Sequence, residues 1–485
     1  MKGNRIILYS SISLILFGSC KKFLDKNPDN RTEINTVDKV KQLVGTAYPQ
    51  ADYLTFAETA SDNAEDKGSG SVNDYITSYY FWNDYPSGGT NTAINYWNGC
   101  YSAIASANQA LQSIQENNFG SAVDPYKGEA LICRAYAAHM LSIFFAKPFA
   151  NGGDNSSPGV PYPTTPETIL LGKYTRGTVQ STYDNIEADL TAGMKLLSAN
   201  AYDVPKYHFT PAAAHAFAAR FYLFKGEWQK VIDQVNQIIP SGDIKSNLRQ
   251  WTSYFKPMSL EDYHTAFTKT NVSATLLQSS SYSGYQRVYT TPQYGYGSTL
   301  SNMFLADGNC VKKAVDNKVA NYGLPNYTTY KWKEYFFYAT ASTGYPYLPV
   351  ILFTVDEALL NRAEAYAQLG QFDLALNDLN TFYSVRMSYY NATNDAVTFP
   401  KIMAYYSISD QKTGIIRAIL DAKKAEFLQE GLRWLDIVRT GMTVKHNVID
   451  SKGVETFIEL KPGDPRRLFQ LPEQAKLAGI ELNPR

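Results

Sequence analysis

The chain has 485 residues, with 45 Lys and Arg against 45 Asp and Glu, and so a formal net charge of zero. This balance gives no reason to expect a nucleic-acid partner or a polybasic contact with a membrane. The length exceeds what one hydrophobic core usually supports, so we expect either one large, closely packed body or two joined lobes.

The first 20 residues have the pattern of a bacterial lipoprotein signal. A positively charged start precedes the apolar run from Ile6 to Phe17, and small residues and Cys20 follow it. An apolar run of about 12 residues is too short to span a bilayer and is typical of a cleaved export signal. We therefore expect loss of residues 1–19 and a lipid anchor on Cys20, which would hold the chain on a membrane. The alternative is a soluble secreted protein cleaved near Ser19.

Three cysteines remain after Cys20: Cys100, Cys133 and Cys310. An odd number cannot all pair within one chain. Cys100 and Cys133 occur in helical, partly apolar contexts where a buried thiol is the commoner state. A disulfide between these two is the alternative.

Helical periodicity follows a polar stretch, residues 20–34, which we interpret as a tether. It predicts at least nine helices, over residues 35–48, 94–116, 124–145, 179–197, 211–225, 228–239, 355–369, 372–386 and 413–429. Thr210 and Pro211 form a strong helix start, because Thr caps free N–H groups and Pro fits the first helical position.

Two of the helix pairs have the spacing of a tetratricopeptide repeat. One copy has Ala363, Tyr366, Gly370, Phe372 and Ala375, and the other has Ala219, Tyr222, Gly226, Trp228 and Val231. Small residues let antiparallel helices approach, the aromatic residue fills the gap between repeats, and glycine makes the turn. A generic helical hairpin is the alternative.

Long segments that are rich in aromatic and polar residues interrupt these helices. The clearest are residues 49–90 and 240–349, and a third, Gly- and Pro-rich segment covers 151–166. Irregular stretches of this length are usually functional or disordered, and their aromatic content argues against disorder. We expect 49–90 and 240–349 to be insertions that face a ligand, carried by a helical scaffold.

No catalytic or metal-binding motif stands out in the sequence. The five histidines have no metal spacing, and there is no HExxH, CxxC, GxSxG, Walker or dinucleotide-binding motif. The acidic run from Asp62 to Asp66 lacks the alternation and the glycine of a calcium loop, which favours a solvated acidic loop. We predict a binding protein without metal or cofactor. A hydrolase that uses paired carboxylates remains the alternative.

Aromatic residues beside polar residues suggest where a ligand binds. Exposed rings stack on sugar rings or peptide side chains, while neighbouring polar groups orient hydroxyls or amides. The predicted ligand-binding residues are Tyr80, Trp82, Asn83, Asp84, Tyr294, Tyr296 and Trp332. The alternative for each aromatic residue is a ring that packs inward and holds a loop onto the helices.

The most specific motif lies near the C-terminus. It comprises Glu426-Phe427, Glu430-Gly431, Arg433-Trp434, Asp436-Ile437 and Arg439. We interpret its charged residues as an ion-pair network. Together with segments 22–28, 97–111, 128–148 and 176–190, this motif resembles the SusD/RagB family of nutrient-binding outer-membrane lipoproteins, over nearly the whole mature chain.

The resemblance implies a mainly α-helical, SusD-like superhelix with four tetratricopeptide-like helix pairs and long loop-rich insertions. It implies a single body over 35–485, with the helical repeats within 35–240 and 350–440. It also implies a cell-surface protein that binds an oligomeric nutrient and delivers it to a SusC-like, TonB-dependent barrel in the outer membrane. A glycan is favoured. A peptide-binding lipoprotein of the same type and a tetratricopeptide scaffold that binds only protein are the alternatives.

Overall fold

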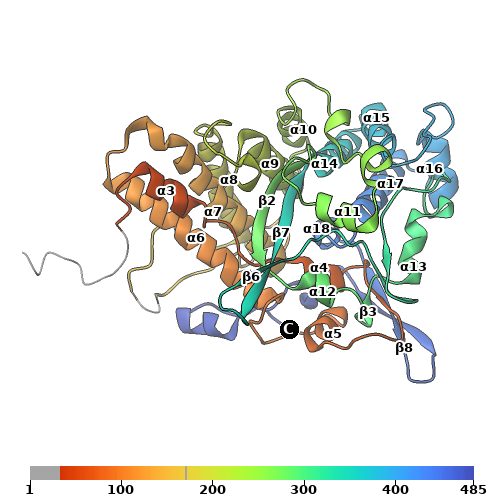
Figure 1. The fold of residues 1–485 in the computed structure, drawn as a ribbon, viewed down its shortest axis with the longest axis horizontal. Helices are drawn as coiled ribbons and strands as arrows, with labels where there is room; N and C mark the ends of the chain where they lie inside the picture. Colours follow the sequence, from red (N-terminus) through yellow and green to blue (C-terminus); the bar gives the residue numbers. More distant parts are fainter. Residues whose placement is uncertain (1–32, 170–171) are drawn as a thin grey trace, which may run out of the picture.

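The computed structural model describes residues 33–169 and 172–485, and within them the fold is mainly α-helical, as predicted. Long helices pack side by side across the upper part of the molecule (Figure 1). They are α3 (Val37–Val44), α6 (Ala93–Glu116), α7 (Asp124–Phe145), α8 (Val179–Met194), α9 (Pro211–Lys225), α10 (Trp228–Asn236), α14 (Val355–Gln368), α15 (Phe372–Tyr383) and α17 (Gln411–Glu426). Each of the nine predicted helices is therefore present, with ends shifted by a few residues at most.

The predicted helix start and repeat turns are confirmed. The side chain of Thr210 accepts a hydrogen bond from the backbone N–H of Ala213, and Pro211 is the first residue of α9. Gly226 and Gly370 adopt left-handed conformations, with φ of 71° and 75°. Each glycine turns the chain from one helix to the next, between α9 and α10 and between α14 and α15, which is the role that the repeat spacing predicts.

Antiparallel neighbours α6 and α7, α7 and α8, α9 and α10, and α14 and α15 pack against one another. Small residues allow helices α7 and α8 to pack closely. A Cβ atom on Gly128 of α7 would lie 2.7 Å from the carbonyl oxygen of Gly193 in α8. The helix pairs therefore stack into the scaffold that the tetratricopeptide spacing indicates.

Shorter helices fill the segments between the long ones. They are α4 (Leu54–Ala60), α5 (Asp74–Tyr80), α11 (Leu260–Ala266), α12 (Tyr285–Val288), α13 (Ser298–Ser301), α16 (Phe399–Tyr406) and α18 (Leu432–Thr440). The periodicity did not predict them as separate helices, because two or three turns give too few repeats of the apolar pattern.

Residues 240–349, which show little sustained periodicity, contain much of a three-stranded antiparallel sheet. Its order is β2 (Thr275–Tyr282), β7 (Gly344–Thr354) and β6 (Tyr335–Tyr338). The expectation of a largely irregular insertion is thus wrong for these strands. Two-stranded pairs join β1 (Glu65–Asp66) to β3 (Tyr294–Gly295), β4 (Ala320–Asn321) to β5 (Tyr327–Thr328), and β8 (Val444–Ile449) to β9 (Glu455–Leu460). The β1–β3 pair brings the two predicted insertions together.

The charged residues of the C-terminal motif form buried ion pairs, as interpreted from the sequence. Glu430 contacts Arg249 at 2.7 Å and Lys331 at 2.6 Å. Arg433 contacts Asp62 at 2.7 Å. Arg439 contacts Glu364 at 2.6 Å and Asp436 at 2.7 Å. Except for Asp436, which lies in the same helix as Arg439, the partners come from distant segments, so these ion pairs join the C-terminal helices to the rest of the body.

The acidic run at Asp62 is part of this network. Arg433 and Lys424 both contact its carboxylate. Burial raises the pKa of Asp62, but the attraction of Arg433 and Lys424 outweighs burial and holds the pKa far below its ordinary value. In the described part of the chain, no group of three or more His, Cys, Asp and Glu side chains is arranged to hold a metal ion.

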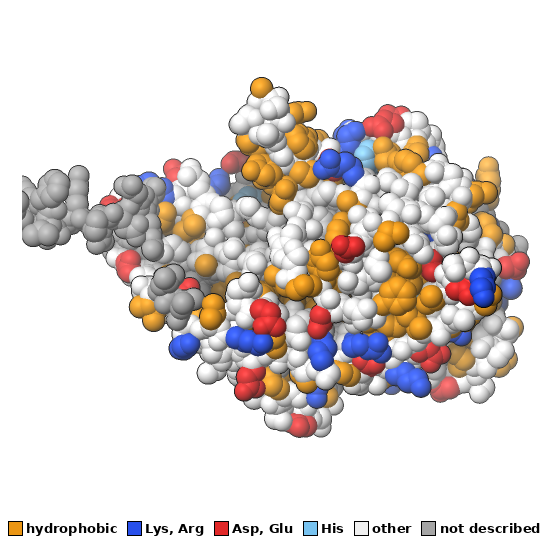
Figure 2. Space-filling model, turned by 90° about the horizontal axis from the view of Figure 1, so that it is seen from below, with side chains coloured by type: hydrophobic (Ala, Val, Ile, Leu, Met, Phe, Trp, Pro, Cys, Tyr) orange, Lys and Arg blue, Asp and Glu red, His pale blue; other side chains and the backbone are white. Residues whose placement is uncertain are grey.

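None of the three cysteines in the described chain forms a disulfide. Cys100, Cys133 and Cys310 are buried free thiols, and burial raises the pKa of each. On the face that Figure 2 shows, acidic and basic side chains are interspersed around hydrophobic clusters. Over the residues described, no helix combines the length and apolarity needed to cross a membrane. The predicted signal peptide and the predicted lipidation site, Cys20, lie outside the described residues.

Candidate functional site

The structure places three of the predicted aromatic residues in one buried cluster. The ring of Tyr80 lies between Tyr294 and His446, with centroid distances of 4.3 and 4.2 Å. The ring of Trp82 stacks on the same imidazole at 4.6 Å, and its Nε1 donates a hydrogen bond to the carbonyl oxygen of Ala60. The side chain of Trp82 is only 5% exposed. In this conformation, protein groups cover the ring faces that the prediction assigns to a ligand.

His446 contacts the rings of Tyr80 and Trp82 and also two backbone carbonyl groups. Its Nδ1 lies 2.8 Å from the carbonyl oxygen of Tyr80, and its Nε2 lies 2.8 Å from that of Ser61. Burial lowers the pKa of His446, and the two carbonyl contacts offset only part of that effect. The imidazole thus fastens β8 to both ends of the segment from Ser61 to Tyr80.

The other predicted residues lie apart from this cluster's centre. Trp332 is 1% exposed, and its Nε1 donates to the carbonyl oxygen of Gln429 at 2.9 Å. Tyr296 is also buried. Asn83 and Asp84 are exposed, and Asp84 pairs with Arg485 at 2.6 Å. The aromatic residues pack inward, as the alternative describes, and their role in ligand binding stays a prediction.

A groove of about 520 Å³ opens where parts of both predicted insertions meet helix α6. We call it the tyrosine groove. The lower end of the three-stranded sheet lies beside α6 in Figure 1. The groove is lined by Thr46, Tyr48, Gln50, Ala51, Asn95, Asn98, Gly99, Ser102, Ser106, Tyr282, Tyr345 and Tyr347.

Helix α6 supplies the polar wall of the groove. Asn95, Asn98 and Ser102 are three and four residues apart, so they share one face of the helix. A Cβ atom on Gly99 would lie 3.0 Å from the Cβ of Ala51. The absence of a side chain at Gly99 therefore lets the segment before α4 lie directly against the helix.

The sheet supplies the aromatic wall. The backbone N–H of Tyr282 donates to the carbonyl oxygen of Gln50 at 2.9 Å, which joins the segment before α4 to the edge of β2. The ring centroid of Tyr282 lies 5.3 Å from that of Tyr345 and 6.0 Å from that of Tyr347. Tyr345 and Tyr347 point to the same side of β7 because side chains alternate along a strand.

Most polar side chains of the groove are available to a ligand. Among the described residues, none makes a hydrogen bond with the side chain of Gln50, Asn95, Asn98 or Ser102, nor with the hydroxyl group of Tyr282, Tyr345 or Tyr347. Three other lining residues are engaged. The hydroxyl of Thr46 donates to the carbonyl oxygen of Leu43 and to Ser106. The hydroxyl of Tyr48 donates to Glu129 at 2.5 Å, and burial raises the pKa of Tyr48. The side chains of the groove wall therefore offer donors and acceptors that are not used within the described chain.

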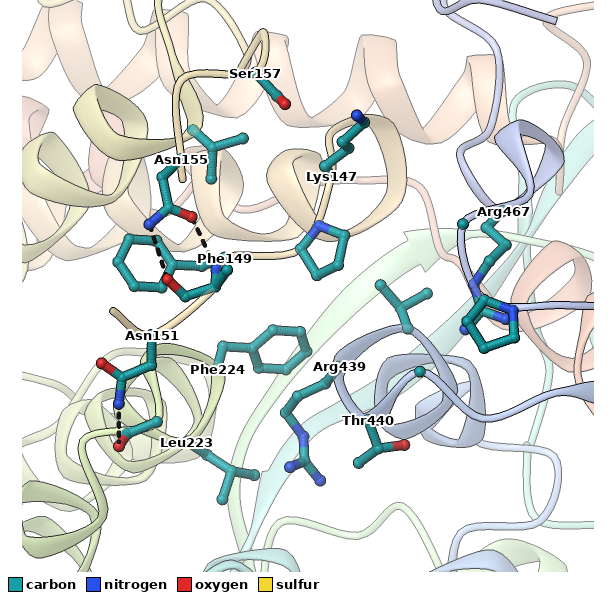
Figure 3. Close-up of a pocket in the computed structure, with 18 of the residues that line it drawn as sticks. Lys147, Phe149, Asn151, Asn155, Ser157, Leu223, Phe224, Arg439, Thr440 and Arg467 are labelled. Atoms are coloured by element: carbon teal, nitrogen blue, oxygen red, sulfur yellow. Dashed lines mark hydrogen bonds between the residues drawn. The ribbon is translucent and has the colours of Figure 1, made fainter. Parts of the chain in front are cut away.

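A larger hollow, of about 1000 Å³, lies between residues 147–157, the end of α9 and helix α18 (Figure 3). Its polar side chains hold the protein's own backbone. Asn151 donates to the carbonyl oxygen of Gly226, and Asn155 exchanges hydrogen bonds with the backbone of Ala150, as the dashed lines show.

The guanidinium groups of this hollow are also engaged. Arg467 donates to the carbonyl oxygens of Ile437 and Met442 at the end of α18, and burial lowers its pKa. Arg439 is held by its two carboxylate partners. The tyrosine groove is therefore the better candidate site, although it is the smaller hollow.

Sequence reasoning did not select the residues of the tyrosine groove. Two signals were present. Asn95, Asn98 and Ser102 have helical spacing on the polar side of a predicted helix, and Tyr345 and Tyr347 alternate as strand residues do. Neither signal reveals that a helix and a strand so far apart in the chain face each other.

Two family models match the chain in succession. A model described as "Starch-binding associating with outer membrane" matches residues 22–223, and the model of the SusD family matches residues 278–466. A curated SusD-like protein of Formosa agariphila is 24% identical, over 92% of this chain and 92% of that protein.

Solved structures share the fold. A SusD superfamily protein from Bacteroides thetaiotaomicron superposes with a TM-score of 0.66 at 19% identity, over 93% of this chain and 100% of that chain. A SusD-like carbohydrate binding protein from Bacteroides vulgatus gives 0.65 at 15% identity, over 92% and 96%. The successive family matches span most of the chain, and the helical fold agrees with them: the chain belongs to the SusD family.

Proposed function

We propose that this chain is a non-catalytic, cell-surface lipoprotein that binds an oligosaccharide in the tyrosine groove. It then delivers the sugar to a SusC-like, TonB-dependent barrel in the outer membrane. Membership of the SusD family supports binding and outer-membrane association, and the matched model's description names both starch and the outer membrane. A related solved structure is described as carbohydrate binding.

The observation that carries the proposal is the combination of tyrosine rings and unengaged amides in one groove. The C–H face of a sugar ring packs against an aromatic ring, here Tyr282 or Tyr345. The sugar hydroxyls both donate and accept hydrogen bonds, as the amides of Asn95 and Asn98 do. Each kind of group in the groove therefore has a matching group on a carbohydrate.

The proposed lipid anchor would position the binding site at the outer membrane. A lipid on Cys20 would hold the chain on the outer membrane, and residues 20–34 would link the anchor to the first described helix, α3. A tether of this kind lets a binding subunit swing over a barrel without diffusing away. The proposed partner is therefore a membrane-embedded transporter that the anchored protein covers as a lid.

Calorimetric titration of the purified chain against glycans and peptides tests the ligand class. We expect binding to an oligosaccharide and a weaker affinity in Asn98→Ala. Gln115→Ala is the matched control, because Gln115 is exposed on the same helix but does not line the groove. Binding to a peptide alone, or equal affinities for both variants, would contradict the proposal.

Two further assays separate the alternatives. A hydrolase would release new reducing ends from the bound sugar during prolonged incubation, whereas we expect none. A protein-only scaffold would purify from membranes without a barrel and would bind no sugar, whereas we expect a barrel transporter to co-purify.

A further inference from the structure

The structure carries an aromatic surface that continues beyond the tyrosine groove. We infer that the ligand is an uncharged oligosaccharide long enough to run from the groove onto one face of the β6–β7 hairpin, which selects for chain length. This inference rests on the proposed function and names the substrate class and the residues that recognise it.

The strand register places the hairpin residues on the groove side. Tyr335 of β6 is directly opposite Tyr347, and Tyr347 is directly opposite Tyr282 of β2. Phe337 is directly opposite Tyr345. Residues that are directly opposite in an antiparallel sheet point to the same side. These five residues therefore form one aromatic face, which we call the hairpin platform.

The platform has two rows. The inner row holds Tyr282, Tyr347 and Tyr335, and the outer row holds Tyr345 and Phe337. Two residues along a strand separate the rows by roughly 6.6 Å. The side chains of Phe337 and Tyr345 are 62% and 48% exposed. Contiguous exposed apolar patches often mark binding surfaces. The opposite face of the hairpin is exposed as well, with Phe336 at 42% and Tyr338 at 66%, so continuity with the groove has to distinguish the two faces.

The platform is continuous with the groove, which indicates that one ligand occupies both. Tyr345 lines the groove and also forms the outer row, so a chain of sugars bound in the groove would pass directly onto the platform. The opposite face of the same hairpin carries Phe336 and Tyr338, whose rings contact each other at 4.8 Å. That pair does not line the groove, and this makes it a control built into the same two strands.

The composition of the groove indicates that the ligand is uncharged. Among its described lining residues there is no Lys, Arg, Asp or Glu. Two buried carboxyl groups lie next to the lining residues: Glu129 accepts the hydrogen bond from Tyr48 and also contacts His208 Nδ1 at 2.8 Å, and Asp52 follows Ala51 in the chain. A uronate or sulfate would lose hydration without gaining a cationic partner among the lining residues.

Calorimetry on the purified full chain tests this inference. The probes are uncharged oligosaccharides from disaccharide to octasaccharide and uronate oligosaccharides of matched length, each at low and high salt. We expect affinity to rise with length for the uncharged series, independently of salt, and weaker binding of the uronates. Phe337→Ala should weaken binding of the long probes by about threefold to tenfold and leave the disaccharide unchanged. Phe336→Ala should match the wild type.

The possible outcomes separate this inference from the proposed function. If no sugar binds, or if Asn98→Ala has no effect, the proposed function fails. If Asn98→Ala weakens binding but length, Phe337→Ala and uronate charge make no difference, only the inference is overturned. The inference would also be overturned if Phe337→Ala keeps its sugar affinity but no longer co-purifies with the barrel, or if this variant loses self-association that the wild type shows. The platform would then be a protein interface. Both phenylalanines are exposed, so thermal unfolding of each variant verifies that it folds.

Discussion

Tyr282 and Tyr345 meet edge to face in the tyrosine groove, with ring centroids 5.3 Å apart and ring planes at 84°. Tyr282 ends β2, and Tyr345 lies near the start of β7. One ring thus turns its edge toward the face of the other and fixes its orientation, an arrangement that stabilises aromatic pairs by about 0.5–1.5 kcal/mol. The pair forms a corner in which a sugar ring can stack on one residue and contact the other.

The corner predicts coupled effects on ligand affinity. Tyr282→Ala and Tyr345→Ala should each weaken oligosaccharide binding by about 1 kcal/mol, and their effects should not add, because the rings contact each other. Calorimetric titration of the two single variants and the double variant measures the coupling. Tyr282→Phe keeps the ring and is the control. Strictly additive effects would show that the two residues act separately.

Trp82→Ala should affect the stability of the fold. Its ring is buried against His446 and its Nε1 is hydrogen bonded, so truncation should cost about 3–5 kcal/mol of unfolding free energy. Urea unfolding measures this cost, and Trp82→Phe, which keeps a ring, should lose less. A variant of unchanged stability that has lost sugar binding would instead support the sequence-based assignment of Trp82 to the ligand site.

Glu58 should give the unfolding free energy a distinctive pH dependence. Burial raises the pKa of this carboxyl to about 7 from its ordinary 4.5, although the backbone N–H of Gly431 donates to it. The folded chain therefore binds this proton more tightly than the unfolded chain. The contribution of Glu58 is greatest below about pH 4.5 and is lost as the pH rises through 7, by up to about 1.4 kcal/mol per pH unit.

Glu58→Gln isolates this contribution, because Gln keeps an acceptor for Gly431 but does not titrate. Urea unfolding of both proteins from pH 5 to pH 8 should show that the wild type loses stability relative to the variant as the pH rises. Parallel profiles would mean that the Glu58 carboxyl is not perturbed by burial.

The Glu430 ion pairs should contribute far more to stability than a surface pair. Burial raises the pKa of Glu430, but the attraction of Arg249 and Lys331 outweighs it and lowers the pKa overall. Glu430→Gln takes the carboxylate partner from the buried Lys331 and one of two from Arg249, which keeps Glu426 at 2.9 Å, and it should cost about 3–5 kcal/mol. The control is Glu473→Gln, which breaks an exposed pair with Lys476 and should cost less than about 1 kcal/mol. Equal costs would contradict a buried network at Glu430.

The proposed lipid anchor on Cys20 predicts where the protein is located. Cys20→Ser removes the only thiol at the end of the signal, so the variant should leave the outer-membrane fraction and appear in the soluble fraction. Membrane fractionation with an antibody to the chain measures this. A variant that stays in the membrane fraction would show that another contact holds the protein there.

The long helices could be predicted because their signals are local. For α9, the capping Thr210, Pro211 at the start and Gly226 at the end define both bounds within the sequence itself. The strands could not be predicted in the same way. In β2, Gln278, Ser279 and Ser281 are polar but buried, so the apolar alternation that marks a half-buried strand is missing.

The candidate site was harder to predict because exposure depends on distant neighbours. Trp82 is buried against groups that are distant in the chain, among them His446, which β8 brings against its ring. Tyr345 lies in the β6–β7 hairpin opposite Phe337, and both side chains are exposed. Both residues lie in polar, aromatic-rich segments of the sequence, and nothing local distinguishes the ring that packs inward from the ring that faces a ligand.

A crystal structure of the chain with its tightest-binding oligosaccharide would locate the bound ligand directly. We predict sugar density in the tyrosine groove, with a ring stacked on Tyr282 or Tyr345 and hydroxyls bonded to Asn95 and Asn98. Density in the larger hollow beside Phe149 and Arg439, with the tyrosine groove empty, would contradict the assignment of the groove as the binding site.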